Sequence, residues 1–200
     1  MKDYYFTIDK PAVAEYKDKG STFLAYAYPL SDVQEFKNIL AELKKEHPKA
    51  NHHCFAYKIG LSGNVYRVSD DGEPSGTAGR PILGQIESRN LTDVLIIVVR
   101  YFGGTLLGVP GLIKAYKTVA SLVLQTVPAV QKQRMETLEI SFNYENMNDV
   151  MKLLKEVNSN ILHQDLTLFP HIKAQIPSIR MDELKFKLKN LHNVEFKNLV

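Results

Sequence analysis

The sequence predicts a two-domain α+β protein, with one α/β domain over residues 1–132 and a small ferredoxin-like domain over residues 135–200. Apolar residues recur with strand-like and helix-like periods in both parts of the chain. A short polar stretch, residues 131–134, separates these parts. The second part also shows the element order β-α-β-β-α-β, which is the ferredoxin-like pattern.

In the first domain, residues 23–29 alternate as a strand that ends at Pro29. Ser31 and Gln34 have the spacing of a capping box, and the helix behind them ends before Pro48. The other elements expected here are strands at 54–59, 65–69 and 94–99, a short helix at 81–88, and a long helix from residue 112 to about residue 128.

In the second domain, the spacing of apolar residues alternates along the chain between every second residue, as in strands, and every three or four residues, as in helices. Pro170 separates two of the expected strands. The elements expected are strands at 138–142, 161–168, 171–176 and 194–199, with helices at 146–157 and 179–191.

Composition limits the class of protein. Hydrophobic residues make up 44% of the 200 residues and charged residues 24%, as in globular proteins that bury a core. The single cysteine, Cys54, excludes an internal disulfide and argues against secretion. The longest aliphatic run, residues 94–99, is far shorter than the ~20 residues of a membrane helix. We therefore expect a cytoplasmic protein without a membrane partner.

Net charge is +3, and the positive charge lies in the first part of the chain. Residues 1–134 hold 17 Lys and Arg against 13 Asp and Glu, whereas residues 135–200 hold 8 against 9. This distribution favours the first domain for any contact with an anion such as nucleic acid.

The loop at residues 69–81 is rich in glycine, hydroxyl and carboxylate groups. Its second half, with Ser75, Gly76 and Thr77, leads into a helix start, where free backbone N–H groups favour an anion. Arg80 could hold the same anion through two hydrogen bonds.

The first half of that loop allows other interpretations. Asp70, Asp71 and Glu73 are the hard oxygen ligands that Mg²⁺ takes, and so are candidate metal ligands. Alternatively, the Asp-Asp-Gly sequence is a plain turn and the rest a rigid connector. We expect no bound metal and no cofactor.

A second glycine-rich segment, residues 100–111, follows an expected buried strand and opens a helix. Gly103 and Gly104 allow close approach of the backbone. Arg100 beside Tyr101 suits the stacking of a base and contact with its phosphate, and Lys114 lies in the first turn of the helix. The aromatic residues could equally belong to the core.

Two shorter segments complete the candidate site. On a strand, His52 and Cys54 would face one side and His53 the other. We expect Cys54 to be a small buried residue, while His52 could serve as a donor, a base or a filler. Lys19 and Ser21 supply a further cation and hydroxyl before the first expected strand.

Together these segments resemble the YigZ/IMPACT family. Four blocks in the family's order carry the resemblance: residues 19–23, residues 50–57, residues 69–81, and residues 98–112. Thr22 departs from the pattern, because many relatives have Arg there. The resemblance covers nearly all of the chain.

The resemblance implies that the first domain is similar to the second domain of ribosomal protein S5, and the second to the last domain of elongation factor G. By analogy it implies kinship with the translation machinery and contact with RNA or the ribosome. Eukaryotic members interfere with activation of an eIF2α kinase through a partner protein, for which they use an additional N-terminal domain. We expect neither that domain nor that partner here. The family implies no catalytic residues.

We therefore expect a non-enzymatic regulatory protein that contacts RNA or ribosomal proteins. The site expected for this contact comprises Lys19, Ser21, His52, Ser75, Gly76, Thr77, Arg80, Arg100, Tyr101, Gly103, Gly104 and Lys114. The alternative is a Mg²⁺-dependent enzyme that acts on a phosphorylated or nucleotide substrate at the glycine-rich loops.

Overall fold

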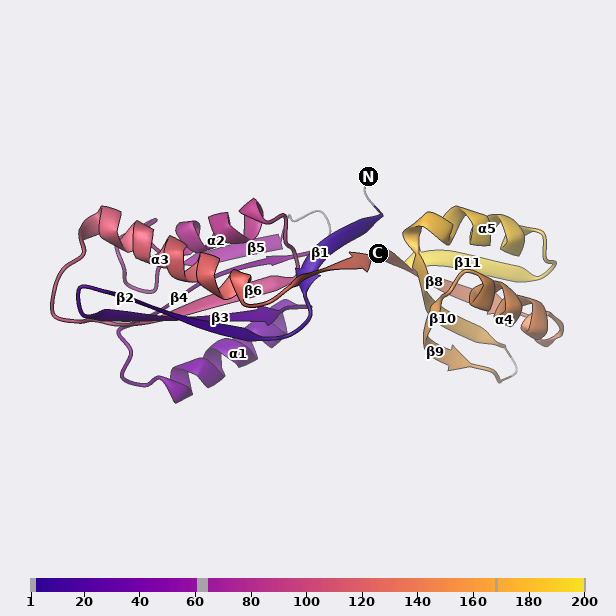
Figure 1. Ribbon diagram of the computed structural model, residues 1–200. Coiled ribbons are helices and arrows are strands. Elements are labelled where there is room, and N and C mark those ends of the chain that lie inside the picture. The colour runs from indigo at the N-terminus through magenta and orange to yellow at the C-terminus, as the bar shows by residue number, and fades with distance from the viewer. Residues whose placement is uncertain (1–2, 61–64, 168, 200) are drawn as a thin grey trace. The chain divides into compact units, whose positions relative to one another are not determined.

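The computed structural model of the chain describes residues 3–60, 65–167 and 169–199 (Figure 1). It divides into two compact units. We call residues 5–132 the N-terminal unit, and residues 133–200 together with residues 1–4 the C-terminal unit. Each contains helices and antiparallel strands, so the mixed α and β composition expected from the sequence is confirmed.

The N-terminal unit is built on a five-stranded antiparallel sheet in the order β2-β3-β6-β4-β5. Helices α2 and α3 cover one face of this sheet, and α1 lies on the other (Figure 1). The elements are β1 (Tyr4–Ile8), β2 (Ala12–Asp18), β3 (Ser21–Pro29), α1 (Val33–Glu46), β4 (His52–Ile59), β5 (Val65–Ser69), α2 (Gly79–Ser88), β6 (Val94–Tyr101), α3 (Gly108–Gln125) and β7 (Ala129–Gln133).

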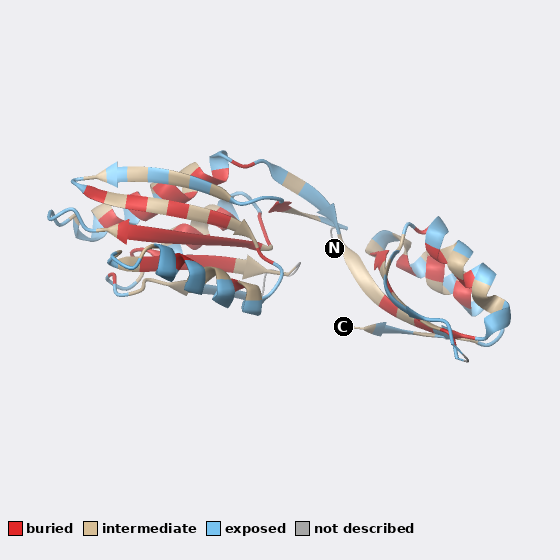
Figure 2. Ribbon diagram, turned by 90° about the horizontal axis from the view of Figure 1, so that it is seen from below, coloured by how far each residue is buried: buried red, intermediate tan, exposed pale blue. Residues whose placement is uncertain are grey.

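The central position of β6 in the sheet agrees with its sequence. Its aliphatic residues from Val94 to Val99 are all fully buried, because helices cover both faces. In contrast, β3 alternates between buried and half-buried residues, which Figure 2 shows as alternating red and tan. The strand expected at residues 94–99 is thus confirmed, with two further residues.

Some details differ from the sequence-based expectation. The N-cap of α1 is Asp32 rather than Ser31, because the Asp32 carboxylate accepts hydrogen bonds from the backbone of Gln34 (2.7 Å) and Glu35 (2.8 Å). Helix α3 begins at Gly108, four residues before the expected start. Strands β1, β2 and β7 were not expected, and β1 pairs with β7 in a separate two-stranded sheet.

The C-terminal unit has the expected element order β-α-β-β-α-β. Its strands form an antiparallel sheet in the order β11-β8-β10-β9, and a core of buried aliphatic residues lies between this sheet and helices α4 and α5. The elements are β8 (Met135–Phe142), α4 (Met147–Glu156), β9 (Asn160–Asp165), β10 (His171–Pro177), α5 (Met181–Lys189) and β11 (Val194–Leu199), with 3-10 turns at Tyr144–Asn146 and Ser178–Arg180.

The described helices of both units are too short or too polar to cross a lipid bilayer.

Candidate functional site

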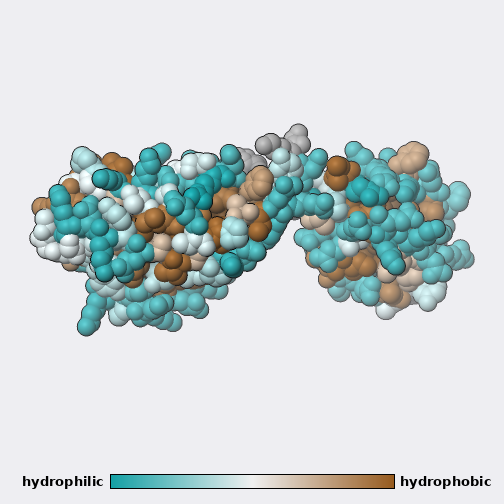
Figure 3. Space-filling view, viewed as in Figure 1, coloured by the Kyte–Doolittle hydropathy of each residue, from teal (hydrophilic) through white to brown (hydrophobic). Residues whose placement is uncertain are grey.

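Four segments that are distant in the sequence meet at one end of the five-stranded sheet. The Gly103 N–H donates to Ser21 Oγ (3.2 Å), and the Phe102 N–H donates to Asn51 Oδ1 (2.8 Å). His52 Nδ1 donates to the Asp71 carbonyl (2.8 Å). Figure 3 shows pale, near-neutral residues at this end of the unit, as glycine-rich loops would give. The segments singled out in the sequence therefore form one surface.

The turn before β3 and the loop after β6 touch through their backbones. A Cβ atom on Gly103 would lie 1.9 Å from the carbonyl carbon of Gly20, which no side chain could tolerate. Glycine at position 103 is thus required for the approach of the two segments. Gly104 and Gly76, with φ values of +84° and +78°, have open space where a Cβ would stand.

A buried ion pair lies beneath these loops. The Arg100 guanidinium donates through Nη1 to Glu73 Oε1 at 2.6 Å, and the two side chains are only 6% and 4% exposed. Arg100 Nη2 also lies 3.3 Å from Ser21 Oγ. The guanidinium carbon lies 5.3 Å from the ring centre of Phe23. Arg100 therefore already has an internal anion and an aromatic neighbour.

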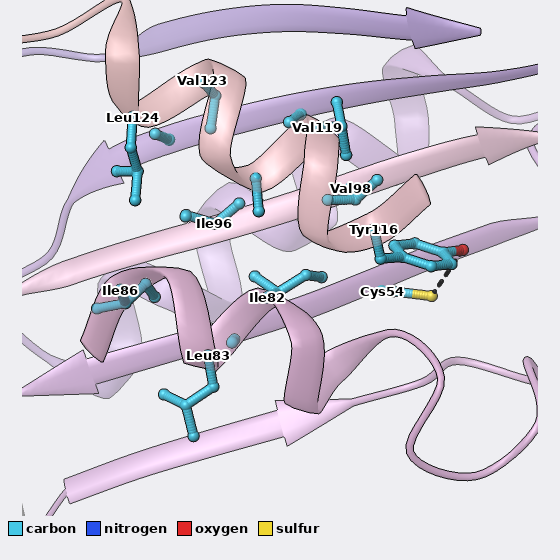
Figure 4. Packing of buried hydrophobic residues seen from close by; sticks show 14 of the residues in the cluster. Cys54, Ile82, Leu83, Ile86, Ile96, Val98, Tyr116, Val119, Val123 and Leu124 are labelled. Carbon is cyan, nitrogen blue, oxygen red and sulfur yellow. Dashed lines mark hydrogen bonds between the residues drawn. The ribbon is translucent and has the colours of Figure 1, made fainter. Parts of the chain in front are cut away.

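Tyr116 and Cys54 extend this buried network. The Tyr116 hydroxyl donates to Glu73 Oε1 (2.7 Å), and Cys54 Sγ lies 3.3 Å from the same hydroxyl (Figure 4). Burial is the main cause that raises the pKa of both the Cys54 thiol and the Tyr116 hydroxyl. Both groups are therefore neutral at physiological pH, and Cys54 is the small buried residue that its sequence context predicts.

The amide groups of the loop before α2 also have an internal anion. The Asp70 carboxylate accepts hydrogen bonds from the N–H groups of Gly76 (2.8 Å), Ala78 (3.0 Å) and Gly79 (2.8 Å). Burial alone would raise the pKa of Asp70, but these three hydrogen bonds and nearby Arg80 hold it below 3.8. Asp70 occupies the place that the sequence analysis gave to an external anion, which corrects that part of the expectation.

Each candidate metal ligand binds a different partner within the fold. Asp70 binds the loop amides, Glu73 binds Arg100, and Asp71 Oδ2 accepts the His53 backbone N–H at 2.6 Å. Among the described residues, no group of three or more His, Cys, Asp or Glu side chains could hold a metal ion. The carboxylate-rich loop is thus bound within the fold, and this arrangement gives the Mg²⁺-dependent alternative no support.

Several other candidates are also engaged internally. Thr77 is buried, and its hydroxyl donates to the Pro74 carbonyl (2.7 Å). Tyr101 is half-buried, and its hydroxyl lies 2.8 Å from His47 Nδ1. His52 is half-buried, with Nε2 3.9 Å from Glu73 Oε1. Ser21, Thr77 and Arg100 therefore support the loops, rather than facing an external anion as expected from the sequence. Tyr101 takes the internal role that the sequence left open for it.

The remaining candidates do point outward. Lys19, Arg80 and Lys114 are exposed and form no ion pair within the described part of the chain. We call these three residues the cationic rim. Ser75, Gly103 and Gly104 are also exposed. In the loop after β6, Phe102 and Leu106 are 44% and 82% exposed, so this loop presents apolar side chains to solvent.

Sequence reasoning missed the internal partners of the site. Glu73 was considered only as a metal ligand, and Tyr116 was not singled out at all. Asn51, which holds Phe102, and His47, which lies between the hydroxyls of Tyr26 and Tyr101, carried no signal. Asp70 could have been found, because an aspartate before an uncapped, glycine-rich helix start is a natural acceptor for its amides.

Comparison with known proteins agrees with this geometry. The sequence profile of the Impact N-terminal domain matches residues 19–124, which include all four converging segments. The chain belongs to the IMPACT family. The profile begins at Lys19 and ends within α3, so the IMPACT domain coincides with the part of the N-terminal unit that forms the buried network and the cationic rim.

Two bacterial relatives extend the similarity beyond the IMPACT domain. The IMPACT family member YvyE of Bacillus subtilis is 36% identical over 78% of this chain and 72% of its own length. The IMPACT family member YigZ of Escherichia coli is 31% identical over 85% and 84%. A crystal structure described as a hypothetical protein matches the whole chain and 99% of its own chain, with a TM-score of 0.81 and 26% identity.

Proposed function

We propose that this IMPACT family protein is a cytoplasmic, non-enzymatic regulator that contacts RNA or the ribosome. The contact surface is the cationic rim with the adjacent glycine-rich loop from Phe102 to Gly108. Residues behind this surface, including Arg100 and Glu73, fix its shape and do not touch the guest.

The exposure of the cationic rim carries the proposal. Lys19 comes from a turn, Arg80 from the first turn of α2, and Lys114 from the second turn of α3, because that helix begins earlier than expected. None of the three forms an ion pair within the described residues. Exposed lysines and arginines bind phosphates by releasing counterions. Phe102 is exposed on the loop after β6 and could stack on an unpaired base, which favours single-stranded RNA.

The chemistry of the buried network supports a non-enzymatic role. An activated nucleophile needs a lowered pKa or an adjacent base, together with access to substrate. Cys54 is fully buried, and burial raises the pKa of its thiol. Tyr116 is also fully buried, and its hydroxyl donates to Glu73. These groups are suited to holding the loops in place.

The proposed link to translation rests on fold kinship. We propose that the N-terminal unit is similar to the second domain of ribosomal protein S5 and that the C-terminal unit has a ferredoxin-like fold. The strand order β11-β8-β10-β9 and the element order of the C-terminal unit support the second assignment.

Binding of a labelled single-stranded RNA at low ionic strength tests the proposal. We expect Lys19→Glu, Arg80→Glu and Lys114→Glu together to weaken binding by about a hundredfold, because each reversal removes a phosphate contact and adds a repulsion. The matched control reverses three exposed lysines of α4 and α5: Lys152, Lys155 and Lys189. The absence of RNA binding by the unaltered protein, or equal losses in both variants, would refute the proposal.

A further inference from the structure

The sheet of the N-terminal unit has one face that its own helices only partly cover. On the side of α1, Phe36 packs against Phe55 and Tyr57, so the helix lies over β4 and β6. Figure 2 shows β2 lying clear of the helix on this side. Accordingly, Val13 on β2 is 55% exposed, and Tyr26 and Tyr28 on β3 are only half-buried.

One side of α1 lines this open area with carboxylates. At 3.6 residues per turn, Glu35, Glu42 and Glu46 fall on a single stripe of the helix. Lys44 lies on a different side, where its Nζ is 3.9 Å from Asp71 beyond β4. The glutamate stripe therefore faces β3, and the charges of Glu42 and Glu46 act on its tyrosines.

The raised pKa values of Tyr26 and Tyr28 agree with this placement. Burial is the first cause that raises the pKa of Tyr28, and the negative charges of Glu46 and Glu42 add to it. For Tyr26 the causes are again burial first and then Glu46. We call Val13, Tyr26, Tyr28, Glu42 and Glu46 the acidic-aromatic face.

Several other charged groups lie near this face, among them the exposed Lys45 between Glu42 and Glu46 on α1. Lys17 and Glu15, which follow Val13 along β2, form an ion pair at 2.8 Å. His47 Nε2 forms a hydrogen bond with the Tyr26 hydroxyl (2.7 Å), and the same nitrogen lies 3.8 Å from Glu46 Oε1. Past Tyr28, a cavity of roughly 200 Å³ is lined by Glu35 and Asp93 together with Lys132.

We propose that the acidic-aromatic face binds an extended, arginine-rich protein segment. Guanidinium groups are attracted to the faces of tyrosine rings, and they pair with carboxylates through two parallel hydrogen bonds. The tyrosines and glutamates lie side by side here, so neighbouring arginines could use both. The face would repel the phosphates of RNA, because the carboxylates of Glu42 and Glu46 are negative.

This inference does not depend on the proposed RNA contact, which uses the cationic rim. The chain as a whole carries a net charge of +3, so attraction by total charge cannot bring a cationic peptide to it. Saturable binding of such a peptide requires a local acidic site.

The test uses the full chain and a fluorescein-labelled peptide of arginine and glycine, of about eight residues, which spans β3 at ~3.4 Å per residue. Fluorescence anisotropy should show saturable binding. In the variant with Glu42→Lys and Glu46→Lys, we expect affinity to fall at least about tenfold, because two attractive contacts become repulsive. Both substituted residues are exposed, so the fold should be retained.

The matched control reverses two exposed glutamates elsewhere, with Glu87→Lys on α2 and Glu145→Lys in the C-terminal unit. We expect its affinity to change less than about twofold. A second variant, Tyr28→Leu, keeps an apolar side chain but removes the ring, and should weaken the arginine peptide severalfold. Absence of saturable binding, equal loss in both reversed variants, or displacement of the peptide by single-stranded RNA would overturn the inference.

Discussion

At the scale of residues, the decisive feature is that the site supplies its own anions. Glu73 neutralises Arg100, and Asp70 binds the amides at the start of α2. Both carboxylates lie in the loop that the sequence marks as functional. Their partners could not be assigned from sequence, because Arg100 lies 27 residues beyond Glu73 and meets it only in the folded sheet.

Glu73→Gln should destabilise the protein by about 3 kcal/mol or more, because it leaves the buried Arg100 charge without a counterion. Urea denaturation measures the change in free energy of unfolding. Glu87→Gln, at an exposed position of α2, is the control and should stay within about 0.5 kcal/mol of the unaltered protein. A Glu73 variant as stable as this control would mean that the ion pair contributes nothing to the fold.

Asp70→Asn should cost about 1–2 kcal/mol at neutral pH, the usual range for loss of a capping carboxylate. The pKa of Asp70 is lowered in the folded state, so its stabilisation is complete above the unfolded value of about 3.8 and is lost as pH falls through the lower folded value. Thermal unfolding of both proteins between neutral and acid pH should show the difference shrink below about pH 4. A constant difference would contradict the role of the charge.

At the scale of elements, the loop from β6 to α3 is held against the turn before β3 by the contact of Gly103 with Gly20. Gly103→Ala should destabilise the N-terminal unit by about 1–3 kcal/mol, because the added Cβ forces the two backbones apart. Gly104→Ala meets no atom within 4 Å and should cost about 1 kcal/mol, from its positive φ alone. If Gly104→Ala lowered the melting temperature more than Gly103→Ala, the backbone contact would be unimportant.

Elements with a strong apolar period were predictable, and elements defined by distant pairing were not. The sequence of β6 is aliphatic throughout, and α3 repeats its apolar residues every three or four positions, so both were expected. Strand β2 carries Glu15 and Lys17 at the open edge of the sheet. It is defined by its hydrogen bonds to β3, which local sequence does not show.

The candidate site was predictable in the same partial way. The sequence indicated which segments matter, because glycine and charge concentrate in them. It could not distinguish Arg100, which is buried, from Arg80, which is exposed, because each arginine follows or begins a regular element and only the packed sheet sets its burial.

At the scale of the whole molecule, each unit has its own hydrophobic core. The cationic rim lies entirely in the N-terminal unit, so a fragment of residues 5–132 should bind single-stranded RNA within about threefold of the full chain. Circular dichroism establishes that the fragment is folded before binding is measured. A folded fragment without RNA affinity would assign the contact to the C-terminal unit.

The central claim is that outward cations, and not the buried Arg100, meet a negatively charged guest. The most direct measurement is the salt dependence of RNA affinity for the unaltered protein and for the variant with Lys19→Ala, Arg80→Ala and Lys114→Ala. Each phosphate contact on a single strand contributes a slope of about 0.7 to the plot of log affinity against log salt concentration. We predict a slope smaller by about 2 in the variant, and an unchanged slope would contradict the claim.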